Sequence, residues 1–191
     1  NIPYANELGV LCGYEAVEGF NNVYFTDYNA LPDSLSFQTG GIYLQNPSSV
    51  LPAQILASYM PENPPVLDMS AAPVGKTCAL SDMFGRKGLI IANEPSKSRL
   101  KALHFNLEKY GAWNVKTLNS DGRQLSKYYE NTFDGVLLDA PCSHENQIGV
   151  NKKVLEQWSP AYVEQMASLQ RGLITSAFDC LKPGGVLVYS T

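Results

Sequence analysis

Short apolar runs alternate along the chain with segments whose apolar residues recur at helical spacing, and this alternation begins at Pro65. An apolar run bounded by turn residues is typical of a strand buried in a parallel sheet, and apolar residues three and four apart are typical of a helix that buries one face. Strands that alternate with such helices predict an α/β fold with a doubly wound, mostly parallel sheet. The predicted strands are Val66–Met69, Leu89–Asn93, Val115–Leu118, Phe133–Leu138 and Val186–Ser190, and the predicted helices are Lys76–Phe84, Lys97–Tyr110, Gln124–Tyr129 and Pro160–Leu181.

The first 62 residues show a weaker pattern. Asn22–Thr26 and Ile42–Gln45 resemble short strands, and Pro47–Ala57 resembles a helix with prolines tolerated in its first turn. Three prolines within Met60–Pro65 indicate a connection between two parts of the chain. We therefore expect a partial N-terminal region with a lead-in helix over residues 1–62 and a second domain over residues 63–191.

The net charge of the chain is −4, but the charge is unevenly distributed. Residues 1–75 hold seven acidic side chains and no Lys or Arg, which leaves 14 basic and 11 acidic residues in the remainder. The overall charge argues against a dedicated nucleic-acid binder, whereas the asymmetry permits a modest basic face on the second part. No apolar run reaches the length that crosses a bilayer, and no signal peptide opens the sequence.

The four cysteines, Cys12, Cys78, Cys142 and Cys180, lack the spacing of a metal site. Scattered cysteines in a chain long enough for its own core indicate reduced thiols, so a cytoplasmic protein without a metal is expected. We also expect a monomer that does not bind membranes.

The segment Val66–Thr77, VLDMSAAPVGKT, joins a predicted strand to a helix through small residues. Such a loop lets backbone N–H groups approach a ligand at the helix N-terminus. Gly75, Lys76 and Thr77 fit the end of a P-loop, but Ser70 stands where its first glycine is needed. Three interpretations remain at this point: a P-loop NTPase whose magnesium-binding strand ends at Asp139, a nucleoside cofactor site of the methyltransferase kind, and a purely structural turn.

Two acidic residues follow the next two strands. Glu94 lies 19 residues after Gly75, near the spacing at which a carboxylate accepts hydrogen bonds from both ribose hydroxyls. The alternative is a surface glutamate favoured by the start of the following helix. Asp121, followed by Gly122, either accepts a hydrogen bond from an adenine amino group or belongs to an ordinary Asp-Gly turn.

The segment Phe133–Ser143, FDGVLLDAPCS, delivers Asp139 and Cys142 to the carboxyl end of a buried strand. Ligands of open α/β sheets bind at that end. Cys142 is therefore a candidate for chemistry, although a free cysteine is often a small packed hydrophobe.

Taken together, these motifs resemble the RNA cytosine-5 methyltransferases of the NOL1/NOP2/Sun family, above all its bacterial 16S ribosomal RNA members. The resemblance covers about Gly40–Thr191, and the Asp-Ala-Pro-Cys sequence is its most specific part. It is carried by GIYLQNPSSVLP, VLDMSAAPVGKT, LIIANEPSKSRLKALHFNLEKYG, FDGVLLDAPCS and LQRGLITSAFDCLKPGGVLVYST. The resemblance implies a Rossmann-like class I methyltransferase fold. It also implies methyl transfer from S-adenosylmethionine to carbon 5 of cytosine in RNA, either ribosomal RNA or transfer RNA.

The resemblance also implies roles for individual residues. The loop would cradle the cofactor's methionine portion, Glu94 would bind the ribose, and Arg99 would support the site unless it is a solvated helix charge. Asp121 with Gly122 would bind the adenine. Asp139 would border the cofactor and hold the cytosine, and Cys142 would assist proton removal and product release. The loop residues are Ala71, Ala72, Pro73, Val74, Gly75 and Lys76.

The nucleophilic cysteine of the family is expected one residue beyond Thr191, so the 191-residue chain by itself is expected to be inactive. Three residues also depart from the family pattern. Val74, His144 and Asn146 stand where the family has glycine, and a β-branched residue such as Val74 resists a positive φ. A degenerate RNA-binding member of the family without catalysis is therefore the non-enzymatic alternative.

Overall fold

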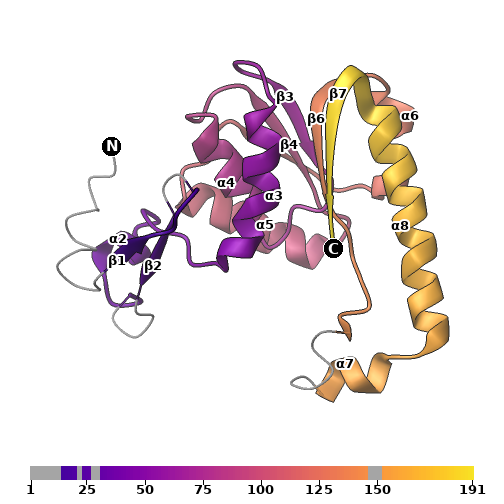
Figure 1. The fold of residues 1–191 in the computed structure, drawn as a ribbon, viewed down its shortest axis with the longest axis horizontal. Helices are drawn as coiled ribbons and strands as arrows, with labels where there is room; N and C mark the ends of the chain where they lie inside the picture. The colour runs from indigo at the N-terminus through magenta and orange to yellow at the C-terminus, as the bar shows by residue number, and fades with distance from the viewer. Residues whose placement is uncertain (1–13, 21–22, 27–30, 146–151) are drawn as a thin grey trace.

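The computed structural model describes residues 14–20, 23–26, 31–145 and 152–191, and its central feature is a five-stranded parallel sheet (Figure 1). The strand order is β5-β4-β3-β6-β7. Successive strands therefore run outward from β3 in one direction and from β6 in the other, and the reversal lies between these two strands. Ligands of such sheets bind beside the carboxyl ends of the strands at this reversal. The strands are β3 (Pro65–Asp68), β4 (Leu89–Asn93), β5 (Val115–Leu118), β6 (Phe133–Asp139) and β7 (Leu181–Ser190).

Helices cover both faces of the sheet, as Figure 1 shows with α3, α4 and α5 on one side and α8 on the other. Leu56, Leu80 and Leu103 contribute one buried cluster from the first three helices, and Leu125 and Ala177 belong to a second cluster on the opposite face. Because both faces are covered, the central strands β3, β4 and β6 are mostly apolar and buried. The helices are α3 (Pro47–Ser58), α4 (Gly75–Met83), α5 (Lys97–Lys109), α6 (Ser126–Tyr129) and α8 (Pro160–Cys180), with the 3₁₀ turn η1 (Gly122–Gln124).

Local sequence explains where the longer helices begin. The side chains of Asn46, Ser96 and Ser159 each accept a hydrogen bond from a backbone N–H in the first turn of α3, α5 and α8. Pro47 and Pro160 occupy the first helical position, where a missing N–H costs nothing. Helix α4 is the exception, because its N-cap residue Val74 makes no side-chain cap.

The predicted doubly wound parallel sheet is confirmed, and its strands agree with the prediction to within a few residues. Strand β7 is longer than predicted because it starts at Leu181, where the predicted helix ended. The predicted helix Gln124–Tyr129 is divided into η1 and α6. The sequence pattern missed α2 (Leu35–Gln38) and α7 (Lys152–Gln157), both too short to show a helical period.

The prediction of a strand over Ile42–Gln45 is wrong, since these residues pair with no strand. Instead Tyr43 packs edge-on against Tyr110, with ring centroids 4.9 Å apart, and the segment lies against the start of α4. The pairing partner of β2 (Tyr24–Thr26) is β1 (Tyr14–Ala16), which the apolar pattern did not indicate. Asn22, Cys12 and Asn146 lie outside the described residues.

Helix α3 belongs to the core of the sheet rather than to a separate body, because Val50, Ala53 and Leu56 are buried and the last two join the α4–α5 cluster. The boundary after residue 62 stays a prediction.

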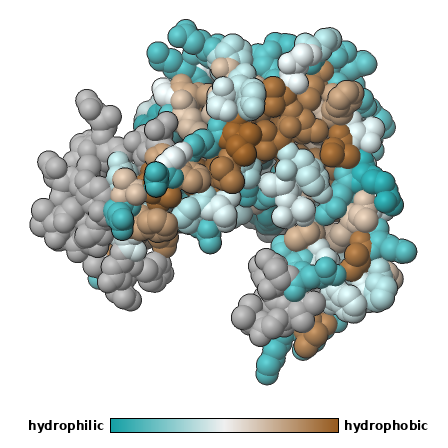
Figure 2. Space-filling view, in the orientation of Figure 1, coloured by the Kyte–Doolittle hydropathy of each residue, from teal (hydrophilic) through white to brown (hydrophobic). Residues whose placement is uncertain are grey.

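Figure 2 shows hydrophobic side chains gathered over the region of α3 and β7, where Leu51 and Ile55 are exposed. Within the described residues, no helix combines the length and apolar character needed to cross a membrane.

A buried asparagine ties three strand ends together. The Asn93 amide nitrogen donates to the carbonyls of Met69 and Ser120, at 3.1 Å and 3.0 Å, and its oxygen accepts from the Ser120 N–H at 3.1 Å. Since Asn93 is fully buried, water cannot replace these bonds. The side chain therefore fixes the loops after β3 and β5 to the end of β4.

Replacing this asparagine should destabilise the whole domain. We expect Asn93→Ala to lower the free energy of unfolding by about 2–4 kcal/mol, because two carbonyls and one N–H lose their partners inside the protein. Asn93→Asp keeps the shape but turns both donors into acceptors, and we expect at least an equal loss. Urea unfolding followed by circular dichroism measures both free energies of unfolding. A loss below about 1 kcal/mol would contradict the role of these Asn93 hydrogen bonds, which we call the Asn93 clamp.

Candidate active site

The carboxyl end of β3 carries a buried acid. Thr77 Oγ1 donates to Asp68 Oδ2 at 2.6 Å, and the Ser70 N–H reaches Oδ1 at 3.4 Å. Burial raises the pKa of Asp68 to about 6, although these hydrogen bonds and Lys76 act in the opposite direction. Asp68 therefore connects the end of β3 to the first turn of α4 at an electrostatic cost.

The loop between β3 and α4 is held from one side by β4 and α5. The Ala71 N–H donates to the Asn93 carbonyl at 2.9 Å, and Arg99 Nη2 donates to the Ala72 carbonyl at 2.6 Å. The Ala72–Pro73 peptide bond is cis. These contacts fix the backbone of the loop whose N–H groups were predicted to face a ligand.

Val74 has a φ of 133°, a conformation that suits glycine and that a β-branched residue adopts only under strain. Its side chain is fully buried in the cluster of α4 and α5. The predicted conflict between a valine and a positive φ is therefore present, and hydrophobic packing offsets it.

An ion pair joins the loop to β6. Lys76 Nζ lies 2.7 Å from Asp139 Oδ2, and the Ser190 hydroxyl donates to Asp139 Oδ1 at 2.7 Å. Both carboxylate oxygens of Asp139 are thus engaged, one from α4 and one from the end of β7. The pair spans the reversal of strand order, so it brings the predicted loop and the predicted catalytic strand together.

A hollow of about 90 Å³ lies beside this ion pair. The loop, Lys76 and Asp139 line one side, and Tyr43 and Gln45 line the other. Gln45 lies against Gly75, where an added Cβ would force the side-chain oxygen of Gln45 to move. The buried Oε1 of Gln45 has no hydrogen-bond partner among the described residues. An acceptor without a partner, a cation and an anion therefore border one small hollow.

Glu94 is almost completely buried at the end of β4. Its Oε1 accepts from the Ser96 N–H at 2.8 Å, and Oε2 lies 3.5 Å from Arg99 Nη1. Since Arg99 also holds Ala72, it links the acid to the loop. The alternative of a surface glutamate is therefore excluded, and Arg99 has a specific position rather than being only a solvated charge.

Asp121 makes contacts within its own turn. It caps η1 and forms an ion pair with Arg123, with Nη2 and Oδ2 2.6 Å apart, and the hydrogen bond from Arg123 lowers the pKa of Asp121. Gly122 is buried against Leu173, where a Cβ would lie only 2.6 Å from Cδ2. Both residues therefore have structural roles whether or not they contact a ligand.

Cys142 lies half-buried three residues beyond Asp139, and its Sγ is 3.5 Å from His144 Nδ1. The loop that carries both runs from the end of β6 towards α7 (Figure 1). The other described cysteines are buried, and burial raises the pKa of Cys78 to about 12 and that of Cys180 to about 11. Among described cysteines, Cys142 is therefore the one placed for chemistry.

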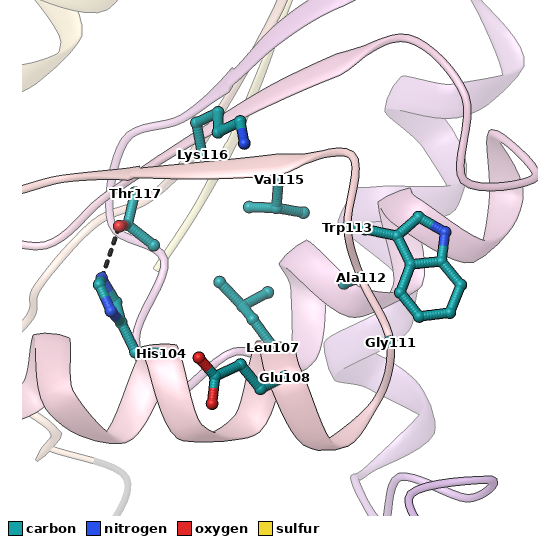
Figure 3. A pocket seen from close by; sticks show the side chains of 9 residues that line it. All are labelled: His104, Leu107, Glu108, Gly111, Ala112, Trp113, Val115, Lys116 and Thr117. Atoms are coloured by element: carbon teal, nitrogen blue, oxygen red, sulfur yellow. Dashed lines mark hydrogen bonds between the residues drawn. The ribbon is translucent and has the colours of Figure 1, made fainter.

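A larger hollow lies elsewhere (Figure 3). About 480 Å³ opens between α5 and the edge strand β5, with Leu107 and Val115 at its floor and Trp113 at one end. His104 faces Thr117 across it, with Nε2 and Oγ1 2.6 Å apart. None of the predicted site residues lines this hollow.

The structure thus brings the predicted loop, Glu94, Arg99 and Asp139 into one connected set. It also shows contributors that the sequence did not single out: Gln45, Asn93 and Ser190. All three lie within segments that carried the family resemblance, but no residue pattern marked their side chains. Within the described residues, no group of three His, Cys, Asp or Glu side chains gathers as a metal site would.

Comparison with known proteins agrees with this arrangement. Residues 53–191 match the family described as 16S rRNA methyltransferase RsmB/F. The chain is 46% identical over 154 residues to ribosomal RNA small subunit methyltransferase F of Shewanella amazonensis, an alignment that covers 80% of this chain and 32% of that protein. The chain therefore spans about a third of the length of the curated relatives it matches.

Two solved structures share the fold. A methyltransferase homolog from Pyrococcus horikoshii superimposes with a TM-score of 0.79 at 29% identity, covering 96% of this chain and 57% of that one. NSun6 from Pyrococcus horikoshii with SFG gives a TM-score of 0.73 at 36% identity, covering 83% of this chain and 40% of that one. The Rossmann-like methyltransferase fold is thereby confirmed.

The strain at position 74 can be measured by comparing small residues there. We expect Val74→Gly to be more stable than Val74→Ala by about 1 kcal/mol, because both lose the buried side chain but only glycine adopts this φ freely. Val50 is the matched control, since it is buried inside helix α3, where glycine costs about 1 kcal/mol relative to alanine. The same order of stability at both positions would refute the strain at Val74.

Asp68 should give the protein a specific pH dependence. Its folded-state pKa of about 6 lies above the ordinary value of 3.8, so the folded state binds the proton more tightly. The contribution of Asp68 to the free energy of unfolding is therefore most favourable below pH 4. It declines as the pH rises to about 6 and is constant above that pH. We expect Asp68→Asn to gain on the order of 2–3 kcal/mol relative to wild type between pH 4 and pH 7. Urea unfolding across this range measures the difference, and parallel pH curves would contradict it.

Proposed function

The chain belongs to the RsmB/F family of 16S rRNA methyltransferases, and we propose that it binds S-adenosylmethionine and serves transfer of its methyl group to carbon 5 of a cytosine in ribosomal RNA. The observation that carries the proposal is the Lys76–Asp139 ion pair. It connects the candidate cofactor loop to the strand that presents Cys142. The activity and RNA substrate of the longer relatives are part of this proposal, because the chain spans only about a third of them.

The residues around the loop fit the proposed cofactor. The methionine portion of the cofactor carries an ammonium group and a carboxylate. The hollow offers the unpartnered Gln45 oxygen and Asp139 to the ammonium group, and it offers Lys76 to the carboxylate. Glu94 offers a buried carboxylate for the ribose hydroxyls. Among the structural neighbours, NSun6 was solved with SFG, an analogue of S-adenosylmethionine, which supports the same ligand class here.

When bound, S-adenosylmethionine supplies a methyl group on a sulfonium. Carbon 5 of cytosine is a poor nucleophile, and addition of a thiolate to carbon 6 turns it into an enamine-like centre that can accept the methyl group. The attacking thiolate is expected at the position after Thr191. We assign to Cys142 the removal of the carbon 5 proton. We assign to Asp139 the role of holding the cytosine by its ring edge. The base would have to leave its stack to reach them.

Two other functions were compatible with the sequence. The P-loop NTPase loses its support, because the chain belongs to a methyltransferase family. A degenerate member that retains RNA without binding the cofactor keeps one supporting observation, the strained Val74 at the entrance to α4. Cofactor binding distinguishes this alternative from the proposal.

Calorimetric titration tests the proposal directly. We expect the chain to bind S-adenosylmethionine but not ATP with magnesium. We expect Glu94→Gln to weaken cofactor binding by about ten- to a hundredfold, because hydrogen bonds to a buried carboxylate contribute about 1.5–3 kcal/mol. Glu130→Gln is the matched control, since this exposed carboxylate precedes β6 and so lies at the amino ends of the strands, opposite the candidate site.

The outcomes separate the alternatives. Binding of ATP with magnesium alone would overturn the proposal in favour of an NTPase. RNA retention without cofactor binding would favour the degenerate scaffold. Equal cofactor affinities for wild type and Glu94→Gln would refute the ribose assignment while leaving the cofactor site itself in place.

A further inference from the structure

We propose that His144 is the proton acceptor of Cys142, so that the two residues form a thiol–imidazole pair at the end of β6. The pair itself is independent of the reaction, whereas its catalytic purpose rests on the proposed function of Cys142. His144 would be a positioning and proton-transfer residue that acts through this thiol.

Geometry carries the proposal. Cys142 Sγ and His144 Nδ1 are 3.5 Å apart, within hydrogen-bonding range for sulfur. His144 has a φ of 55°, in the left-handed region that non-glycine residues seldom adopt. The contact and this turn of the backbone therefore occur at the same residue.

The loop around the pair is fixed at three points. The Ala140 N–H donates to the Ser190 carbonyl at 2.7 Å, and Gln170 Nε2 on α8 donates to the Pro141 carbonyl at 2.7 Å. Beyond the pair, Trp158 Nε1 donates to Glu145 Oε1 at 2.8 Å. Backbone contacts therefore hold the chain immediately before Cys142, and a side-chain contact holds it immediately after His144.

The described neighbours of the loop are neutral or are engaged with partners of their own. The elements that contact the loop from α8 and β7 do so through the neutral Gln170 and Ser190. The charged groups that flank it are the Lys76–Asp139 pair, whose charges compensate each other, and Glu145, whose carboxylate accepts from Trp158. The exposed ring of His144 can exchange protons with water.

The proton step is balanced within the pair. The electron pair of the S–H bond stays on Sγ, and the lone pair of Nδ1 takes the proton, in the tautomer that carries its hydrogen on Nε2. A thiolate and an imidazolium result, with no change in net charge. The thiolate can then accept the carbon 5 proton of the methylated cytosine, whose C–H electrons restore the C5–C6 double bond as the bond to the attacking sulfur breaks.

Alkylation of Cys142 by iodoacetamide, followed by mass spectrometry of the peptide that contains it, tests the pair without cofactor or RNA. An unassisted thiol is only a few per cent thiolate at pH 7. We expect the wild-type rate at pH 7 to exceed that of His144→Asn by about five- to tenfold, since pairing with an imidazole raises the thiolate fraction. Asparagine is the chosen replacement because it tolerates a positive φ.

His104 provides the matched control. It is the other histidine of the chain and faces Thr117 rather than a thiol, so His104→Asn should leave the Cys142 rate unchanged. Equal alkylation rates for wild type and His144→Asn between pH 5 and 10 would overturn the pair. As a second measurement, Cys142→Ser should move the His144 titration seen by NMR and not that of His104, and an unmoved His144 would also overturn it.

These measurements are separate from the test of the proposed function. A missing effect of His144 would leave cofactor binding untouched, and a failure to bind cofactor would leave the alkylation difference in place. The two proposals can therefore fail independently.

Discussion

The contact between Lys76 and Asp139 is the interaction on which the site depends. Lys76 belongs to the first turn of α4, and Asp139 ends β6, so the pair joins two elements that are 63 residues apart in the chain. Helix α4 follows β3, and the strand order reverses between β3 and β6. Since a crevice lies outside the carboxyl ends of the strands at such a reversal, side chains define its geometry. Ser190 extends the contact to β7, so three elements meet at one carboxylate.

The same region holds a buried carboxyl group and a strained backbone, and both lower the stability of the folded state. Asp68 is buried and its pKa is raised, and Val74 carries a strained φ, within six residues of each other. Such features persist only where surrounding contacts over-determine the conformation. Here those contacts are the Asn93 clamp, the Arg99 bond to Ala72 and the buried packing of Val74 itself. Their concentration in the candidate cofactor loop, rather than in the helices behind it, agrees with a loop shaped for a ligand.

Hydrophobic period was enough to predict the sheet and its helices, because each strand and helix buries a continuous apolar face. The hydrophobic period failed where individual side-chain contacts, rather than a repeated apolar face, determine the course of the backbone. Ile42–Gln45 looks like a strand, yet Tyr43 packs on Tyr110 and Gln45 on Gly75, and no strand edge is offered to it. Glu94 was predicted from its spacing after Gly75, and Asp139 from its place at the carboxyl end of a strand and from the family resemblance. Spacing could not show that Asp121 pairs with Arg123, because that contact depends on local rotamers.

The size of a hollow would have been a poor guide to this site. The 480 Å³ opening between α5 and β5 is larger, but its lining combines an apolar floor with a His104–Thr117 bond that is already satisfied. The 90 Å³ hollow beside β3 is small, yet it holds an acceptor without a partner and an ion pair. A polar ligand gains most where buried polar groups lack partners, because binding then removes a cost that the free protein bears. The chemistry of the lining, and not the volume, therefore identifies the candidate site.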